Sequence, residues 1–499
     1  MRRHSCFVSC ALFATLCASL PAALAAGPAA LLDASEVGLR DDLTWLADRG
    51  LINLGLGTWP LPVILVTSAI NARRQGTWAT VDLDALARVR GTLAHLDEAT
   101  VVSWRINSAR HPASDAGMAV RARNEAALQL KQDGEAASLR LRLGLQDERL
   151  ARSPGPATLE GSYLALHLPD AVVSLGAVDR WWGPGRYASP ILGNAAPAIP
   201  TLMIRRSDES APGPASLAWI GPWSYEVSVG RPSHYQPSGP ATIGIRLTAR
   251  PLPGLELGVS RFIYWAGEGR PHDLSSLVAA LLGKSNIDDP AVDGPDPSNE
   301  IAGVDLRWAL PTDSATWVGY AHLAGEDEAN ALPSKWIATL GLQLKFATRN
   351  HRVELTAEGT DTRMGNLFGL HSDNRQPAYQ HSAYVDGHYH QGLPIGAFIG
   401  GGGMLSSVGA VLAPIDNPSA LRYEVRLWRA RVSQSGSDPI NAAYGQPGRV
   451  DGQSLQGSGM TSAMRWRLGL AVQRYSASAD SGRRAIGLIG SIEVALHRP

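Results

Sequence analysis

Residues 139–146 read Leu-Arg-Leu-Arg-Leu-Gly-Leu-Gln, and this strict alternation of apolar and polar side chains decides the fold class. A period of two places the leucines on one face of an extended strand and the arginines on the other. Upstream, residues 128–131 alternate in the same way, and Asp133-Gly134 is typical of a hairpin turn. The sequence therefore predicts antiparallel β-structure from about residue 101.

The same alternation recurs along the rest of the chain, and charged residues recur on the polar face. The repeated segments are 243–247, 255–259, 304–308, 340–346, 353–358, 421–427, 466–472 and 486–496. In a soluble sandwich the apolar faces point inward, whereas in an outer-membrane barrel they face lipid and the polar faces line the lumen. Periodicity alone does not choose between these two architectures.

Three features favour the barrel. The segments approach the length of about 9–11 residues that a tilted membrane strand needs. Arg, Lys and Glu recur on successive polar faces, which suits a wet, ion-paired lumen. An export signal in front of a cysteine-free body fits a Gram-negative envelope. We therefore expect an all-β membrane protein, an antiparallel transmembrane β-barrel with a small N-terminal helical region.

The export signal occupies residues 1–25. Arg2 and Arg3 form a basic start, an apolar run follows over 6–20, and Ala23-Leu24-Ala25 supplies the small-residue cleavage pattern. The apolar run is shorter than the roughly 20 residues of a spanning helix, which disfavours a membrane anchor. The three cysteines of the chain, at positions 6, 10 and 17, all fall in this segment. The processed chain would therefore have neither disulfides nor a cysteine nucleophile.

The composition excludes several other classes of protein. The 499 residues carry 45 basic and 45 acidic side chains, and a balanced charge argues against a nucleic-acid binder. A hydrophobic share of 44% is ample for a core and excludes general disorder. No nucleophile elbow, HExxH motif or phosphate-binding glycine loop occurs in the sequence.

A few segments show helical rather than strand periodicity. Leu39, Leu43 and Leu46 predict a helix over 36–49, a second helix is expected from Asp82, and short ones over 63–72 and 274–282. Residues 393–413 lack charge and could be mistaken for a membrane helix. Four consecutive glycines at 400–403 make that unfavourable, so we expect a glycine-rich turn and a strand near 404–412.

The most unusual cluster of side chains runs from residue 179 to residue 205. Neighbouring tryptophans in a strand point to opposite faces, so both cannot sit in one core. Sugars stack on aromatic rings while Arg, Asp and Asn bind their hydroxyls. The alternative is a packed barrel plug or an interfacial aromatic girdle. The candidate carbohydrate-binding residues here are Asp179, Arg180, Trp181, Trp182, Arg186, Tyr187 and Asn194.

A second cluster contributes Trp265, Glu268 and Arg270, followed by a loop reaching residue 297 that is too long for a periplasmic turn. The acidic end of that loop, residues 288–296, hints at cation binding, although solvated charge is the commoner explanation. A third cluster holds His381, Tyr384, Asp386, His388, Tyr389 and His390. Without a third ligand at recognisable spacing, polar loop or lumen contacts are favoured over a metal site.

Several motifs together resemble the Wzi family of capsule-assembly proteins. They are LRDDLTWLADRGLINLGLGTWPLP at 39–62, VDRWWGPGRYASPILGNAAPAIP at 178–200, WAGEGRP at 265–271 with the apolar segment after it, and AYQHSAYVDGHYHQGLPIG at 378–396. Their order and spacing cover nearly the whole processed chain. The resemblance implies an outer-membrane barrel of about 18 strands with helices on the periplasmic side, and a lectin-like role in attaching capsular or exopolysaccharide to the cell.

The resulting expectation is a non-enzymatic, cell-surface barrel that binds an exported polysaccharide. We expect a helical region over 26–100, a barrel over 101–499, contact with outer-membrane lipid, a monomer, and no cofactor, metal or nucleic acid. Two alternatives remain open at this point. One is a passive porin, and the other is a polysaccharide hydrolase or lyase, since distant paired carboxylates escape detection in a single sequence.

Overall fold

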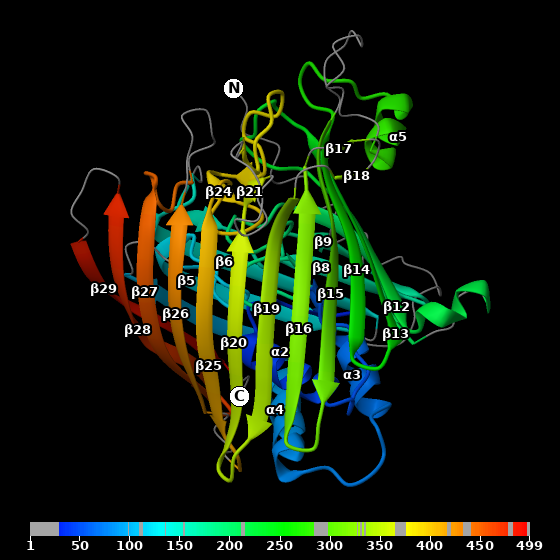
Figure 1. Ribbon diagram of the computed structural model, residues 1–499, viewed down its shortest axis with the longest axis vertical. Coiled ribbons are helices and arrows are strands. Elements are labelled where there is room, and N and C mark those ends of the chain that lie inside the picture. The colour runs from blue at the N-terminus through cyan, green and yellow to red at the C-terminus, as the bar shows by residue number, and fades with distance from the viewer. Residues whose placement is uncertain are drawn as a thin grey trace.

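The computed structural model describes residues 29–496 apart from 98, 109–112, 135, 153–154, 211–214, 284–297, 327, 330–331, 334–335, 365–375, 417–420, 433–440 and 478–482. The predicted signal peptide lies outside the described residues. The described chain forms an upright β-barrel that encloses part of the N-terminal region (Figure 1). Among these residues, no helix combines the length and the apolar character needed to cross a membrane.

The barrel wall is a closed antiparallel sheet of 18 strands within the described residues, and β29 pairs with β4 to complete it. Its strands, in chain order, are β4 (Thr100–Asn107), β5 (Ala122–Asp133), β6 (Ala137–Arg149), β8 (Tyr163–Leu168), β9 (Ala171–Gly176), β11 (Thr201–Arg206), β12 (Trp223–Gly230), β13 (Ala241–Leu252), β14 (Leu255–Trp265), β15 (Ser298–Pro311), β16 (Ala315–Gly325), β19 (Trp336–Ala347), β20 (His351–Asp361), β25 (Met404–Pro414), β26 (Arg422–Val432), β27 (Gly448–Met460), β28 (Met464–Ala477) and β29 (Arg483–Ala495). The barrel and the strand near 404–412 are therefore confirmed.

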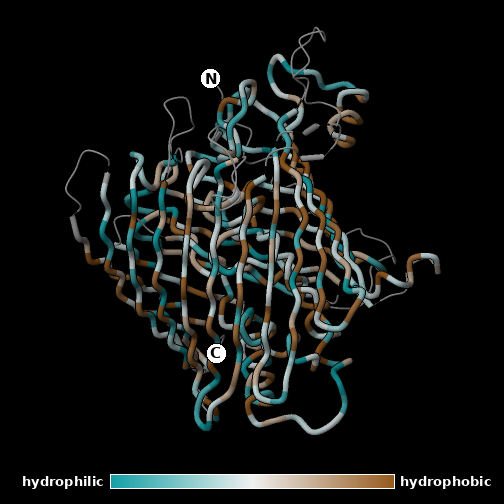
Figure 2. The backbone as a smooth tube through the Cα atoms, in the orientation of Figure 1, coloured by the Kyte–Doolittle hydropathy of each residue, from teal (hydrophilic) through white to brown (hydrophobic). Residues whose placement is uncertain are grey.

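Alternation along each strand separates the two faces of the wall. On β6, Leu139 and Leu145 are 45% and 64% exposed on the outside, whereas Arg140 and Arg142 are buried inside. Figure 2 shows the same alternation of apolar and polar residues along the other strands. Since apolar side chains face outward and charged ones face the lumen, the wall has the polarity of a membrane barrel and not of a soluble sandwich.

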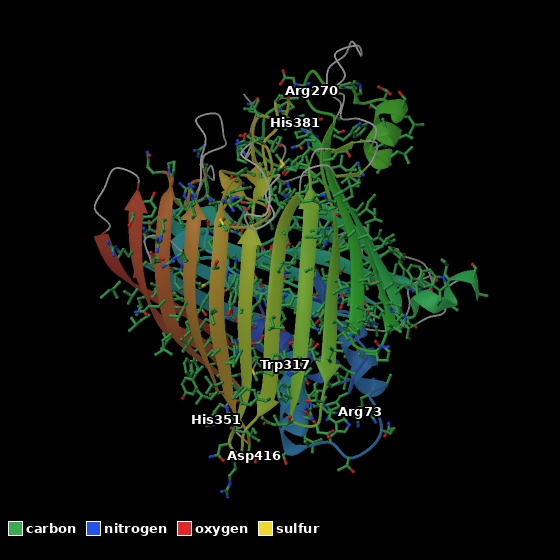
Figure 3. All side chains as sticks on the ribbon, viewed as in Figure 1. Arg73, Arg270, Trp317, His351, His381 and Asp416 are labelled. Carbon is green, nitrogen blue, oxygen red and sulfur yellow. The ribbon has the colours of Figure 1, made fainter. Side chains whose placement is uncertain are left out.

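The two ends of the barrel differ (Figure 1). Helices α3 (Val63–Asn71) and α4 (Thr80–Leu96) lie at one end, here called the helix end, where most of the strands are joined by short turns and the connection from β11 to β12 is longer. Long connections lie at the opposite, loop end, together with α5 (Leu274–Leu282). Outward-facing Trp317 of β16 lies near the helix end (Figure 3), and outward-facing Trp308 lies close to it on the paired strand β15, as expected for an interfacial aromatic belt.

The remaining elements are short. Five two-stranded pairings accompany the barrel: β1 (Leu31–Leu32) with β3 (Leu61–Pro62), β2 (Thr58–Trp59) with β10 (Trp181–Trp182), β17 (Glu328–Ala329) with β18 (Leu332–Pro333), β21 (Arg363–Met364) with β22 (Gln376–Pro377), and β23 (Tyr389–His390) with β24 (Leu393–Pro394). Strand β7 (Ala157–Thr158) extends the wall beside β6, and the 3-10 helix η1 (Ala215–Ile220) precedes β12.

Helix α2 (Val37–Asp48) lies inside the lumen, where its carboxylates pair with inward-facing cations of the wall. Asp42 pairs with Arg352 of β20, and Asp41 pairs with Arg422 of β26. The apolar stripe of α2 packs on α3 and α4, in a core that also contains Trp45 and buried leucines. The predicted helices over 36–49, 63–72 and 274–282 are confirmed, and the second helix begins at Thr80, before Asp82.

Candidate functional site

The tryptophans of the first predicted cluster lie inside the barrel. Trp181 and Trp182 form β10, which pairs with β2 of the N-terminal region, and they are only 2% and 0% exposed. As the alternation predicts, they enter two different cores: Trp181 joins the core under α2, and Trp182 packs on Phe262 with ring centroids 6.4 Å apart. Burial leaves neither ring face open to a sugar, so the geometry favours the alternative of a packed plug.

The charged members of this cluster bind the protein itself. Arg180 pairs with Glu226 and donates to Ser228 Oγ (2.8 Å), and Asp179 accepts from Arg121 (2.5 Å). Arg186 links α2 to the wall. The remaining two members are almost completely buried: Tyr187 and Asn194. These contacts therefore hold the cluster's own segment inside the lumen. We call α2 together with residues 181–200 the plug.

Arg186 is held by two carboxylates from different parts of the chain. Its guanidinium donates to Asp41 Oδ1 of α2 (2.6 Å) and to Glu424 of β26 (3.3 Å). Burial lowers the pKa of Arg186, but these carboxylates raise it well above its ordinary value. Arg186 is therefore a permanent cation that joins both halves of the plug to the wall.

Glu358 of β20 was missed by the sequence analysis. Its carboxylate accepts the backbone N–H groups of Arg186 (2.6 Å), Tyr187 (3.0 Å) and Ala188 (2.8 Å). The acidic position was visible on the polar face of its strand, but nothing in the sequence identified a partner 170 or more residues away. Glu358 thus fixes the turn that follows the tryptophans.

The second predicted cluster lies at the loop end, apart from the plug tryptophans. Three loop segments, residues 231–240, 265–272 and 378–391, meet there, and we call their exposed surface the outer patch (Figure 3). Gln236 N donates to Asp386 Oδ2 (2.7 Å), and Glu268 N donates to the Ser238 carbonyl (2.8 Å). The second and third sequence clusters are therefore neighbours in space.

Arg270 lies over the third cluster. Its guanidinium is 5.9 Å from the centre of the Tyr384 ring and donates to the Ala383 carbonyl at 3.4 Å. His381 supports the same turn, because its Nδ1 accepts the backbone N–H groups of Ala383 and Tyr384. Glu268 is exposed and Arg270 half-buried, so both present polar groups at the surface.

Below the outer patch, aromatic residues and histidines connect it to the plug. The Tyr235 ring stacks on Tyr264 with centroids 5.1 Å apart, and its hydroxyl donates to the Gly387 carbonyl (2.6 Å). His388 Nε2 lies 2.6 Å from the Ile191 carbonyl of the plug, and its Nδ1 lies 3.2 Å from the Tyr264 hydroxyl. The outer patch therefore rests on a packed base.

The histidine pair makes polar contacts with the protein. His390 Nδ1 lies 2.8 Å from the Pro197 carbonyl, and its Nε2 accepts from Ser233. Burial lowers the pKa of both His388 and His390 to about 4, so both rings are neutral at pH 7. In the described part of the chain, no three His, Cys, Asp or Glu side chains are grouped as metal ligands. The acidic stretch 288–296 lies outside the described residues.

Trp265 has a different environment from Glu268 and Arg270. Its indole N–H donates to Ser276 Oγ of α5 (3.1 Å), so the ring lies between the wall and that helix. Trp265 therefore supports the outer patch from below and packs against α5.

A cavity of about 510 Å³ lies at the other side of the plug, between α2, α4 and strands β4, β5, β6, β28 and β29. Charged side chains such as Arg105, Glu125 and Arg465 line it. None of its lining residues, all of which are described, belongs to the outer patch. The cavity in the lumen and the polar surface at the loop end are therefore separate features.

Comparison with known proteins agrees with this architecture. The family model of the capsule assembly protein Wzi matches residues 106–476. The chain belongs to the Wzi family. An uncharacterised 55.8 kDa protein in the cps region of Klebsiella pneumoniae is 30% identical over 434 residues, covering 86% of this chain and 83% of that protein.

Wzi of Escherichia coli has a similar structure, with a TM-score of 0.79, 27% identity, and coverage of 93% of this chain and 99% of that one. It is described as an outer membrane protein involved in group 1 capsule assembly and as a carbohydrate-binding β-barrel. Membership of the Wzi family confirms the resemblance seen in the sequence motifs, and it places this barrel in the outer membrane.

Proposed function

We propose that this Wzi-family barrel binds an exported capsular or exopolysaccharide through the outer patch and helps to attach it to the cell surface, without catalysing a reaction. The observation that carries the proposal is the convergence of three loops at the loop end, where Glu268, Arg270 and Asp386 gather on a packed base. The carbohydrate binding described for the E. coli relative supports it.

The chemistry of the outer patch suits a polyhydroxylated ligand. Carboxylates accept from sugar hydroxyls, and a guanidinium donates several hydrogen bonds in a fixed plane. Each such contact is weak in water, but a repeating polymer can occupy several copies of the surface at once. Avidity then compensates for the weakness of a single site.

The position of the cavity supports binding over passage. A porin needs a continuous aqueous path, whereas here the plug is tied to the wall by Arg186 and Glu358, and the cavity does not include the outer patch. We also propose the arrangement that follows from this function: a cleaved signal peptide over 1–25, helices of 26–100 facing the periplasm, and a monomeric barrel over 101–499 whose loop end faces the medium.

The test compares Arg270→Ala and the double change Glu268→Ala with Arg270→Ala against Arg74→Ala, an exposed arginine at the helix end. We expect the double variant to retain several-fold less polysaccharide on the cell and to release it into the medium. Heat-resistant mobility of the folded barrel should be unchanged in all three. Normal retention by the double variant would remove the outer patch as the binding surface.

Two further measurements address the alternatives. Rapid sugar flux in a liposome-swelling assay would support a porin, whereas slow flux agrees with a binding role. Release of shortened oligosaccharides from the purified polymer would establish a hydrolase or lyase. Both assays use the purified full barrel, so they do not depend on the variants above.

A further inference from the structure

Helix α5 is a well-formed helix in the long connection between β14 and β15. Asp273 caps its first turn by accepting the Ser276 N–H (2.9 Å), and Gly283 ends it in the left-handed conformation, with φ of 68°. A helix of nine residues is too short to be stable by itself in water, so its packing partner explains its presence.

The partner is the outside of the barrel wall. On the inner face of α5, Ala280 is buried against Ile243 of β13 and Ile263 of β14, and the buried Ser276 accepts from the Trp265 indole. These isoleucines alternate with Thr242 and Phe262, which point into the lumen, so they lie on the outward face. Helix α5 therefore rests on the same surface that faces lipid further along the strands.

The opposite face of α5 is a stripe of large apolar side chains. Leu274 is 75% exposed and Leu282 is 54% exposed, with Val278 and Leu281 between them. The spacing i, i+4, i+7, i+8 puts all four on one side of a helix. Because the buried face lies against the wall, this stripe points directly away from the barrel axis.

The stripe continues the apolar surface of the wall. On β14, outward-facing Val259 and Leu257 are 56% and 37% exposed, at the level where lipid must cover them. Between them and α5 lies an outward ion pair of Arg261 with Glu300. Charged groups on the outside of a membrane barrel mark the edge of the hydrocarbon region, and tryptophans such as Trp265 are typical of that edge.

We propose that α5 is an interfacial helix, packed on the outside of the wall, whose outward apolar stripe contacts the lipid of the leaflet at the loop end. Helices of this kind bury one face a short distance below the lipid headgroups. Glu268 and Arg270 of the outer patch lie between the end of β14 and the start of α5, so the helix holds the far end of the segment that carries them. This inference depends on the outer-membrane barrel and not on polysaccharide binding.

The experiment places a fluorescent label on the stripe. Since Cys6, Cys10 and Cys17 lie in the predicted signal peptide, an introduced cysteine is the only thiol of the processed chain. Leu281→Cys, carrying an environment-sensitive dye, is reconstituted in phosphatidylcholine–phosphatidylglycerol vesicles. Val259→Cys is the lipid-facing reference, and Ser382→Cys, exposed at the same end of the barrel, is the aqueous one.

Quenching by lipids with a spin label on the acyl chain should be strong at Leu281→Cys and Val259→Cys, and several-fold weaker at Ser382→Cys. Aqueous iodide should give the reverse order. Iodide quenching at Leu281→Cys equal to that at Ser382→Cys, without quenching by the labelled lipid, would overturn the proposal. Efficient disulfide formation between two copies of unlabelled Leu281→Cys would also overturn it, since it would show a second barrel on the stripe.

Discussion

Lys345 Nζ of β19 lies 2.8 Å from Asp48 Oδ2 at the end of helix α2, and the two side chains are only 2% and 1% exposed. Arg307 of β15 pairs with the same carboxylate. Two cations of the wall therefore converge on one carboxylate of the lumen helix, and Lys345 also pairs with Glu354 at 3.3 Å. Such a contact contributes less by its own strength than by leaving no buried charge without a partner.

Asp48→Asn should consequently destabilise the barrel strongly. The substitution keeps the size of the side chain but removes the carboxylate charge that Arg307 pairs with, while Lys345 keeps its pair with Glu354. Breaking a buried pair in this way typically costs about 3–5 kcal/mol. The midpoint of denaturant unfolding in detergent should fall, and proteases should cut within α2 before the wall unfolds.

The matched control is Asp451→Asn on β27. Asp451 also pairs with two cations, Arg429 and Arg449, but these are 66% and 50% exposed. Exposed pairs contribute about 0–1 kcal/mol, so this variant should unfold close to the unchanged protein. Equal losses in the two variants would show that the position of Asp48 in the lumen has no special role.

Acid should weaken the attachment of the lumen helix. Burial alone would raise the pKa of Asp48, but Arg307 and Lys345 hold it below its ordinary value, and Arg186 and Arg422 do the same for Asp41. A depressed carboxyl pKa gives stability that is present above the unfolded value and is lost as the pH falls toward the folded value. Unfolding midpoints should therefore decline below about pH 4, and Asp48→Asn should reduce that decline.

The packed base of the outer patch should lose stability at a less acidic pH than the attachment of the lumen helix does. His388 and His390 have pKa values lowered by burial from 6.5 to about 4. The unfolded or undocked rings take up protons below pH 6.5, whereas the docked rings stay neutral, so the docked state loses stability between pH 6.5 and 4. Hydrogen exchange of residues 378–391 should accelerate over this range.

A conservative variant tests whether His388 contributes to this acceleration of hydrogen exchange. His388→Gln can still donate to the Ile191 carbonyl and accept from the Tyr264 hydroxyl, but it does not titrate. It should reduce the acceleration between pH 6.5 and 4, with His390 supplying the rest, whereas His351→Gln, at the helix end, should leave the acceleration as it is (Figure 3). An unchanged pH profile in His388→Gln would contradict the assignment.

Much of the wall could be predicted, because alternate residues of a strand face lipid and lumen in turn and differ in polarity accordingly. Leu139 and Arg140 differ in character since one faces outward and the other the lumen. The helix over 274–282 was also predictable, because its apolar residues, its capping Asp273 and its terminal Gly283 are all local features.

The candidate site was less predictable because its contacts join distant parts of the chain. The sequence analysis named both Trp182 and Arg270 as candidate carbohydrate-binding residues, yet Trp182 is buried in the barrel and Arg270 lies at the loop end. Arg270 meets Ala383, 113 residues away, and no local pattern carries that information. The alternation did establish that the two tryptophans separate into different cores.

The role of the plug tryptophans gives a last prediction. Trp182 is fully buried, packs on Phe262 and donates its indole N–H to Glu226 (3.1 Å). Trp182→Ala opens a cavity and leaves Glu226 with one donor fewer, so we expect the free energy of unfolding to fall by about 3–5 kcal/mol.

Trp219→Ala is the control, because Trp219 on η1 is 72% exposed. Trp182→Ala should lower the yield of heat-resistant barrel and the denaturant midpoint, and Trp219→Ala should change neither. If Trp182→Ala kept the full stability of the barrel but lost polysaccharide, the ring would contact sugar and the plug interpretation would be wrong.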